Sequence, residues 1–482
     1  MSEVRGLRRV LGPWSVVAFG VTNQIGAGLF FVSTQVQQTA PGVGDLVPWL
    51  MVVGGALTLL TVVAYRYFFS HGLIGAGGEY VIVSRALNPF TGFIVTFLAW
   101  FGVTGSLGTL AYAAPKFLAT AFNAIGATDT SRFFSSDLGT LVTGLGLLWI
   151  VWLIHVRGVH LAAAIAVLSM CFVVAVTAVV IGYGFSTSPQ TFSAALMAHL
   201  HLSAAKLSAQ APVHRVDWGA AFGTALPVLF FAYLGLSTAT QTGGEAIDAR
   251  RTLARGVLIA VCIVTAIYVL FTFAIYHAVP WQIIAGLAKL KLTAYTTSTG
   301  LFGLVMPGWL ASVINLSVAF IMVKTFIPLF LAQSRWIFAW SEDGLIPDRF
   351  ARTHRRYDTP VLALTISALL ASLSLVESLK LGYVFGVNLR VLSVMSVFFC
   401  IGLAMLLYSV RERDRVLKAA VGIAIMGFAL WFAISIVVTT HLQAWYLQPI
   451  VQAAIVAAVA ALIYRFRSQS PHREPATANP EP

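Results

Sequence analysis

The residue types that could bind a small ligand gather first in a short stretch near the amino terminus. Two amide side chains and two glycines interrupt a run that is otherwise apolar enough to cross a membrane. Because glycine costs about 1 kcal/mol relative to alanine inside a helix, this stretch predicts a broken helix. Freed N–H groups at the positive start of the second half-helix could hold a carboxylate, and glycine would let it approach closely. The residues are Asn23, Gln24, Ile25, Gly26, Ala27 and Gly28.

A second interruption is predicted in the sixth apolar segment, where Pro227 and Gly235 bracket an aromatic cluster. The cluster consists of Phe230, Phe231 and Tyr233. The two interrupted segments are five apart, as an inverted repeat of five helices requires, and paired broken helices are typical of secondary transporters. The alternative is that the small residues permit close helix packing and that Pro227 is an ordinary kink.

Two cations are predicted deep in the membrane. At ~1.5 Å per residue, Lys324 lies about 22 Å from Trp309 and 18 Å from Trp336, and tryptophans favour the two interfaces. Pro328 has no N–H and leaves the Lys324 carbonyl free. By the same rise, Arg390 lies about 15 Å inside the outer end of its helix. These charges predict a core that favours net-neutral or anionic ligands; the alternative for Arg390 is a side chain that extends outward to water.

Composition identifies the elements that position these residues. Hydrophobic residues make up 59% of the 482 residues and charged residues 10%, with a mean hydropathy of +0.87, which indicates a polytopic membrane protein. No nucleic-acid binding is inferred from the net charge of +13, because the Lys and Arg residues that cytoplasmic loops of membrane proteins retain explain most of this charge. Twelve spans are predicted, at residues 11–36, 46–69, 90–114, 138–155, 161–185, 220–240, 256–279, 308–340, 361–375, 383–410, 419–439 and 444–464.

The distribution of Lys and Arg predicts the orientation. With the amino terminus inside, the cytoplasmic segments hold 21 of the thirty Lys and Arg residues and the outer loops hold seven. Because short cytoplasmic loops retain positive charge, both termini are expected to be cytoplasmic, in a plasma-membrane protein. Membrane lipid is an expected partner, since anionic headgroups would reinforce this asymmetry.

The sequence argues against catalysis and against a cofactor. None of the seventeen acidic residues is placed at mid-membrane, so the groups that a membrane-embedded enzyme would need are missing there. Cys171, Cys262 and Cys400 fall inside spans without CxxC spacing, which excludes a disulfide framework and a thiolate metal site. We expect no enzyme activity, no cofactor and no bound metal.

Four segments together resemble the amino acid–polyamine–organocation (APC) superfamily of permeases. They are IGAGLFF at 25–31, GAGGEYVIVSRALNPFTGF at 75–93, FFAYLGLSTATQTGGEAIDARRTLARGV at 230–257 and SRWIFAWSEDGLIPDRFARTHRRYDTPV at 334–361. The last is the most specific, and the four extend in order across most of the first nine spans. The resemblance implies a LeuT-type fold, with ten helices in two inverted repeats and two peripheral helices, that moves amino acids by alternating access.

The resemblance also implies a division of the chain. The expected parts are a cytoplasmic amino terminus (1–10), a first repeat (11–186), an extracellular loop (187–219), a second repeat (220–410), two peripheral helices (419–464) and a disordered cytoplasmic tail (465–482). The tail is rich in proline and polar residues. A monomer or weak homodimer is expected.

Family position suggests roles for individual side chains. Phe231 and Tyr233 resemble the aromatic wall over the substrate side chain. Gly235, Ser237 and Thr238 adjoin the second interruption, and ordinary interhelical hydrogen bonding is their alternative role. Some proton-coupled members carry a lysine in helix five, which this chain lacks.

We therefore hypothesise that Lys324 replaces the helix-five lysine and makes transport proton-linked and sodium-independent. The alternative is a permanently charged structural lysine held by helix carbonyls. The substrate expected from the resemblance is an amino acid. Three other functions stay open, namely an amino acid exchanger, a polyamine or inorganic cation permease of the same fold, and a transporter-like sensor. A cation permease would be expected to carry carboxylates at the midplane.

The orientation can be tested with single cysteines. Cysteines at Ser2 and Ser470 should react with an impermeant maleimide only after cell lysis, whereas one at Ser203 should react in intact cells, because of the Lys and Arg asymmetry. Labelling at Ser470 from outside intact cells would mean an odd number of spans or the opposite orientation.

Overall fold

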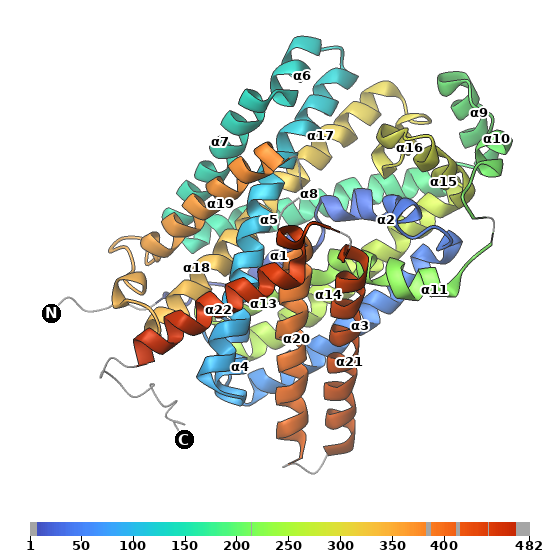
Figure 1. Cartoon of the computed structure of the whole chain (residues 1–482). Helices are drawn as coiled ribbons and strands as arrows, with labels where there is room; N and C mark the ends of the chain where they lie inside the picture. The colour runs from blue at the N-terminus through green and yellow to red at the C-terminus, as the bar shows by residue number, and fades with distance from the viewer. Residues whose placement is uncertain (1–6, 214, 382–386, 411–414, 442, 469–482) are drawn as a thin grey trace.

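The computed structural model describes residues 7–213, 215–381, 387–410, 415–441 and 443–468, and this part of the chain is helical (Figure 1). Its only β-type pairings are two isolated bridges, Leu11 with Ala246 and Ala76 with Thr242. Twelve helical segments are long and apolar enough to cross a membrane. The prediction of an all-α protein with twelve spans is confirmed.

The spans are formed by helices with the following bounds: α1 (Pro13–Gln24) with α2 (Ala27–Thr39), α3 (Val47–Ser70), α5 (Pro89–Ala124), α7 (Asp137–Val156), α8 (Val159–Ser186), the sixth span from α11 (Trp218–Ala220) to α13 (Ser237–Thr240), α14 (Ala249–Ala278), α17 (Gly308–Lys324) with α18 (Phe326–Glu342), α19 (Val361–Leu381), α20 (Val387–Ser409), α21 (Arg415–Thr440) and α22 (Pro449–Ser468). The longer connections contain α4 (Glu79–Ala86), α6 (Thr128–Ser135), α9 (Pro189–Leu200), α10 (Ala204–Ala209), α15 (Trp281–Lys289) and α16 (Ser298–Gly303).

The first span is broken where the sequence predicts it. Helix α1 ends at Gln24, and α2 begins at Ala27. The backbone of Gly26, with φ −105° and ψ −166°, is extended, and any residue can adopt it. The backbone therefore does not require glycine here, and a Cβ at Gly26 would meet Thr325 Oγ1 at 3.5 Å, an ordinary contact distance.

The sixth span differs from the expected unwound segment. It stays helical, but its hydrogen-bonding pattern changes from a π-helical turn (Ala221–Ala225) through α12 (Leu226–Phe230) to a 3₁₀ helix (Phe231–Leu236). Pro227 lies inside this helical run and cannot donate to the Gly223 carbonyl, which instead accepts from the Ser435 hydroxyl at 2.9 Å. Gly235 packs against the end of α1, because a Cβ there would lie 2.6 Å from the backbone nitrogen of Gln24. For Gly235, the alternative of close helix packing therefore holds.

The eighth span is also interrupted, which the sequence analysis does not anticipate. Lys324 is the last residue of α17, and α18 begins at Phe326, two residues before Pro328. Proline cannot donate to the carbonyl four residues earlier, so the helical pattern stops there. The break places Lys324 at a helix end instead of within a continuous helix.

Several span ends extend past the predicted ones, so that acidic residues expected outside the spans lie at or near helix ends. Helix α19 continues to Leu381 and includes the half-buried Glu377. Asp137 begins α7 and Glu342 ends α18. Polar residues are compatible with a helix once it reaches the interface, so hydropathy alone places helix ends too early.

The two ends of the chain are described only in part. Helix α22 runs to Ser468, so residues 465–468 of the predicted tail are helical. Residues 469–482 of that tail, with Ser470, lie outside the described residues, as do residues 1–6 with Ser2. The division into two repeats with an outer loop stays a prediction.

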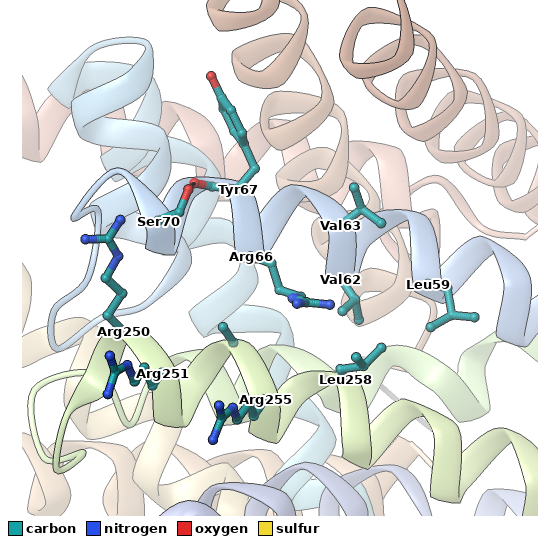
Figure 2. A pocket seen from close by; sticks show the side chains of 11 residues that line it. Leu59, Val62, Val63, Arg66, Tyr67, Ser70, Arg250, Arg251, Arg255 and Leu258 are labelled. Atoms are coloured by element: carbon teal, nitrogen blue, oxygen red, sulfur yellow. Dashed lines mark hydrogen bonds between the residues drawn. The ribbon is translucent and has the colours of Figure 1, made fainter. Parts of the chain in front are cut away.

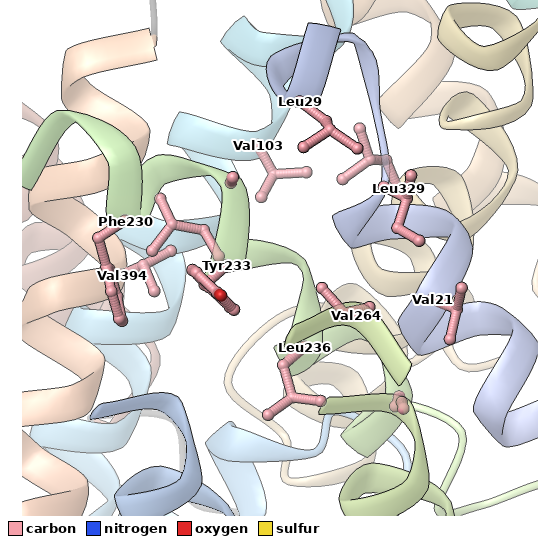
Figure 3. Packing of buried hydrophobic residues seen from close by; sticks show 14 of the residues in the cluster. Val21, Leu29, Val103, Phe230, Tyr233, Leu236, Val264, Leu329 and Val394 are labelled. Atoms are coloured by element: carbon pink, nitrogen blue, oxygen red, sulfur yellow. The ribbon is translucent and has the colours of Figure 1, made fainter. Parts of the chain in front are cut away.

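The broken helices lie at the centre of the bundle. Helix α1 packs against α8, α13, α14 and the 3₁₀ segment of the sixth span, whereas α20 and α21 form a neighbouring pair at one side (Figure 1). Figure 3 shows the apolar core between these elements. Its labelled side chains are Val21, Leu29, Val103, Phe230, Tyr233, Leu236, Val264, Leu329 and Val394. The core thus fixes the broken first helix against the sixth span.

Candidate functional site

A small cavity lies beside the break in the first span. Its volume is about 80 Å³, which corresponds to a few water molecules at about 30 Å³ each. Its walls come from the break, α5, the sixth span, Thr325 between α17 and α18, and α20. The lining residues are Asn23, Gln24, Gly26, Gly28, Ser106, Thr109, Leu110, Phe231, Ala232, Gly235, Thr325 and Arg390.

The break presents a helix amino terminus to this cavity. No side chain caps the start of α2, and both Gly26 and Gly28 line the wall. A Cβ at Gly28 would meet the Phe231 ring at 3.8 Å, an ordinary contact distance. Because the first N–H groups of a helix lack intrahelical partners and its dipole is positive there, this wall suits an anionic group.

The amide side chains before the break have different surroundings. Asn23 donates through Nδ2 to the Gly235 carbonyl at 3.0 Å and to the Thr238 hydroxyl, so it ties α1 to the sixth span. Gln24 donates to the Gly20 carbonyl at 3.2 Å. The side-chain oxygens of both amides are buried without a hydrogen-bond partner in the described part of the chain. Such orphaned acceptors at a cavity wall are available to a donor such as an ammonium group.

The two aromatic residues predicted as a substrate wall point to different places. Phe231 lines the cavity. Tyr233 is buried outside the lining and donates its hydroxyl to the Met51 carbonyl of α3 at 2.8 Å. Ser237 and Thr238, in α13, are also buried outside the lining. The structure therefore brings Phe231, and not the other three, to the cavity.

Lys324 reaches the opposite half of the break. Its side chain is 2% exposed, and Nζ donates to the carbonyls of Thr22 and Ile25. These carbonyls lie at the end of α1, where the helix dipole is negative, so an ammonium is electrostatically favoured. Lys324 does not line the cavity; it lies behind the break, which separates the lysine from the glycine wall.

Arg390 of α20 lines the cavity. It is buried, its guanidinium carbon lies 5.9 Å from the Phe231 ring centre, and its Nε has no hydrogen-bond partner among the described residues. The predicted depth of about 15 Å from the outer end of the helix stays a prediction, because residues 382–386, which precede Val387 of α20, lie outside the described residues. The structure shows that the arginine is buried at the cavity wall.

Several residues of the site were missed by the sequence analysis. Tyr268 of α14 places its hydroxyl 2.5 Å from the Gln24 carbonyl and 3.0 Å from the Ala232 carbonyl, so it holds both interrupted spans. Ser106 and Thr109 add hydroxyl groups from α5. A lone tyrosine or serine in an apolar helix forms no sequence pattern that would predict a binding residue. Thr325 could have been predicted as a site residue, because it adjoins Lys324 in the sequence.

A buried ion pair lies on the side of the arginine-rich loops. Arg335 of α18 donates to both carboxylate oxygens of Glu245, at 2.6 and 3.0 Å, and both side chains are 1% exposed. Nearby, the carboxylate of Glu79 in α4 accepts from Tyr65 at 2.7 Å and Gln241 at 3.4 Å. Burial outweighs these hydrogen bonds and raises the pKa of Glu79 to about 7. These contacts join α4, α18 and the chain after the sixth span.

The described residues contain no group of three His, Cys, Asp or Glu side chains that could hold a metal ion. The geometry therefore offers a cavity of mixed polar and apolar lining between interrupted helices, with the Arg390 cation in its wall and the Lys324 cation at the carbonyls of the break. Such a site can bind a small zwitterion or anion through backbone N–H groups and side-chain oxygens.

Comparison with known proteins assigns the family. The family model described as amino acid permease matches residues 11–473. The chain is 22% identical over 458 residues to the branched-chain amino acid permease of Bacillus subtilis, which covers 90% of this chain and 89% of that protein. It is 24% identical over 373 residues to the human Asc-type amino acid transporter 1, which covers 76% and 65% of the two chains. The chain belongs to the amino acid permease family of the APC superfamily, a family of multi-pass membrane transporters.

Proposed function

We propose that this protein is a secondary active transporter of amino acids that works by alternating access and prefers neutral or acidic substrates to cationic ones. The observation that carries the proposal is the cavity at the break, with the start of α2 and Arg390 in its walls. The break would bind the α-carboxylate, and the orphaned oxygens of Asn23 and Gln24 would accept from the α-amino group.

The charge of the lining supports the substrate preference. Arg390 brings a buried guanidinium to the cavity wall, and the start of α2 adds the positive end of a helix dipole. Among the described lining residues there is no aspartate or glutamate. A cationic side chain or a polyamine would therefore meet a positive wall without a counter-ion, whereas a carboxylate would gain a partner. The cavity argues against the cation permease alternative.

The membrane and orientation are part of the same proposal. We infer that the protein lies in the plasma membrane with both termini on the cytoplasmic side. The asymmetry of 21 against seven Lys and Arg residues supports this orientation. The cavity would then receive its substrate from outside when the helices around the break open in that direction.

Charge selectivity can be tested by competition. Acidic and neutral amino acids should compete with a transported substrate better than lysine or arginine. Arg390→Gln should weaken competition by acidic amino acids roughly tenfold, the size expected for one charge-assisted hydrogen bond, and should affect neutral ones less. The measurement is uptake inhibition in proteoliposomes, with Arg390→Lys as the charge-retaining control. Equal competition by lysine would overturn the proposed preference.

The glycines of the break can be tested against a packing glycine. Gly28→Val should leave the protein folded, because a Cβ there has only contacts of 3.8 Å or more, but should abolish substrate binding by filling the cavity; Gly26→Val should do the same. Gly235→Ala should instead lower the melting temperature, since its Cβ would meet the α1 backbone at 2.6 Å. Normal substrate binding by Gly28→Val would show that the break is not the binding site.

We propose that Lys324 couples transport to protons. Its ammonium contacts the carbonyls of Thr22 and Ile25, in the part of the fold where sodium-coupled relatives are expected, from the resemblance, to hold a sodium ion. Loss of its proton would remove the cation from the end of α1 and weaken the contact that joins α17 to the break. The alternative is that Lys324 is a fixed structural cap.

A single replacement separates these two roles. Lys324→Ala should retain some substrate binding but lose the acceleration of uptake by an inward proton gradient, whereas the exposed Lys206→Ala should behave as wild type. Uptake into proteoliposomes, with and without a pH gradient and with sodium replaced by choline, measures both properties. Gradient-driven accumulation by Lys324→Ala, or a sodium requirement of the wild type, would contradict the assignment.

A further inference from the structure

A second, larger hollow lies far from the substrate cavity, between α3 and α14 at the level of the arginine-rich loops (Figure 2). Its volume is about 700 Å³. The lining residues are Leu59, Val62, Val63, Arg66, Tyr67, Ser70, Arg250, Arg251, Ala254, Arg255 and Leu258. We refer to this hollow as the α3–α14 groove. It shares no residue with the cavity at the break.

One end of the groove is strongly basic. Arg66, at the end of α3, and Arg250 and Arg255, in the first two turns of α14, are exposed and have no carboxylate partner among the described residues. Arg251 has only a loose pair with Asp248 at 3.8 Å, between two exposed side chains. These four arginines line the same hollow, with Arg66 extending from α3 toward α14 and Arg250 and Arg255 extending in different directions from α14 (Figure 2). Guanidinium groups suit phosphate oxygens.

The other end of the groove is apolar. Leu59 lies seven residues before Arg66, which is two helical turns or about 10 Å, and Leu258 lies three residues after Arg255. Figure 2 shows Val62 and Leu258 between the two helices on the apolar side, and Arg66 extending toward α14. Val63 is 46% exposed in a membrane span, so it can face lipid tails. The groove therefore changes from basic to apolar in the direction from the membrane surface to its interior.

We propose that the α3–α14 groove binds an anionic glycerophospholipid, with its phosphate among Arg66, Arg250 and Arg255 and an acyl chain along the apolar wall. The order of polar and apolar residues matches a lipid placed in its own leaflet, with the headgroup at the surface. A soluble phosphate would use only the basic end. A phospholipid would use both the basic end and the apolar wall of the groove.

Occupancy of the groove has a structural consequence. Helix α3 provides the Met51 carbonyl that Tyr233 contacts, and α14 provides Tyr268, which holds both interrupted spans. A lipid in the groove contacts both helices at their ends and should stabilise this arrangement, because a ligand that binds only the folded state raises stability. The inference goes beyond amino acid transport and does not depend on the proposed substrate.

The test compares two triple variants of the full-length protein that remove the same charge. The groove variant is Arg66→Gln with Arg250→Gln and Arg255→Gln. The matched control is Arg349→Gln with Arg352→Gln and Arg355→Gln, three exposed arginines outside the groove on the loop after α18. Native mass spectrometry measures retained dioleoyl phosphatidylglycerol against dioleoyl phosphatidylcholine, and melting temperature is measured with each lipid.

The wild type should retain phosphatidylglycerol in preference to phosphatidylcholine and melt at a higher temperature with it. Each groove arginine should contribute roughly a fivefold change in affinity, so the groove variant should lose the preference while the control keeps it. An equal loss in the control would mean that general surface charge attracts the lipid, and would overturn the proposal. If the triple variant does not fold, the single variant Arg255→Gln should lower the affinity for phosphatidylglycerol by roughly fivefold.

The role of the acyl chain separates a lipid from free phosphate. Millimolar glycerol 3-phosphate should not displace dioleoyl phosphatidylglycerol, and replacing the apolar wall by Leu59→Ser with Val63→Ser should weaken retention of the lipid while leaving the arginines in place. Complete displacement by glycerol 3-phosphate, or unchanged retention in the wall variant, would show that the groove recognises a phosphate without its lipid.

Discussion

The broken first helix is the constraint on which the site depends. A helix interrupted inside an apolar bundle leaves carbonyls at the end of α1 and N–H groups at the start of α2, and neither set can remain unpaired in the membrane without a cost of several kcal/mol per group. The carbonyl end and the N–H end of the break have different surroundings. Lys324 and Tyr268 contact the carbonyl end, whereas the N–H end faces a cavity. The break thereby separates positive and negative potential within a few residues.

Small residues allow the helices to approach closely enough for this arrangement. Gly235 lies directly against the α1 backbone, and Gly54 of α3 lies against the Tyr233 ring, where a Cβ would approach to 2.8 Å. Lipid tails give no hydrophobic drive for helix association, so membrane helices depend on such close packing and on interhelical hydrogen bonds. The bond from Asn23 to Gly235 is one of these. The 3₁₀ geometry of Phe231–Leu236 places Gly235 where the contact is possible.

The sequence was sufficient to predict what hydropathy and backbone propensity control. The twelve spans and the break at Gly26 could be predicted, because both depend on residues that are close together in the sequence. The interruption at Thr325 is not among the sequence predictions. Pro328 indicates a free carbonyl at Lys324, and the structure shows that the helix also ends at this residue. The direction of Tyr233 could not be predicted, because its hydroxyl is fixed by a carbonyl 182 residues earlier. Arg390 is buried at the cavity wall, and its depth within the helix stays a prediction because residues 382–386 lie outside the described residues.

The buried pair of Arg335 and Glu245 has a consequence for how the protein changes shape. Two charges held away from water lose their hydration, and their attraction only partly restores that loss. If the helices around them separate, water enters and hydrates both groups, so the energy lost with the ion pair is largely returned. The pair therefore need not act as a lock. A movement that separates the two charges without admitting water costs the most free energy, because both charges then stay dehydrated and unpaired. Hydration of this side and opening of this side must then occur together.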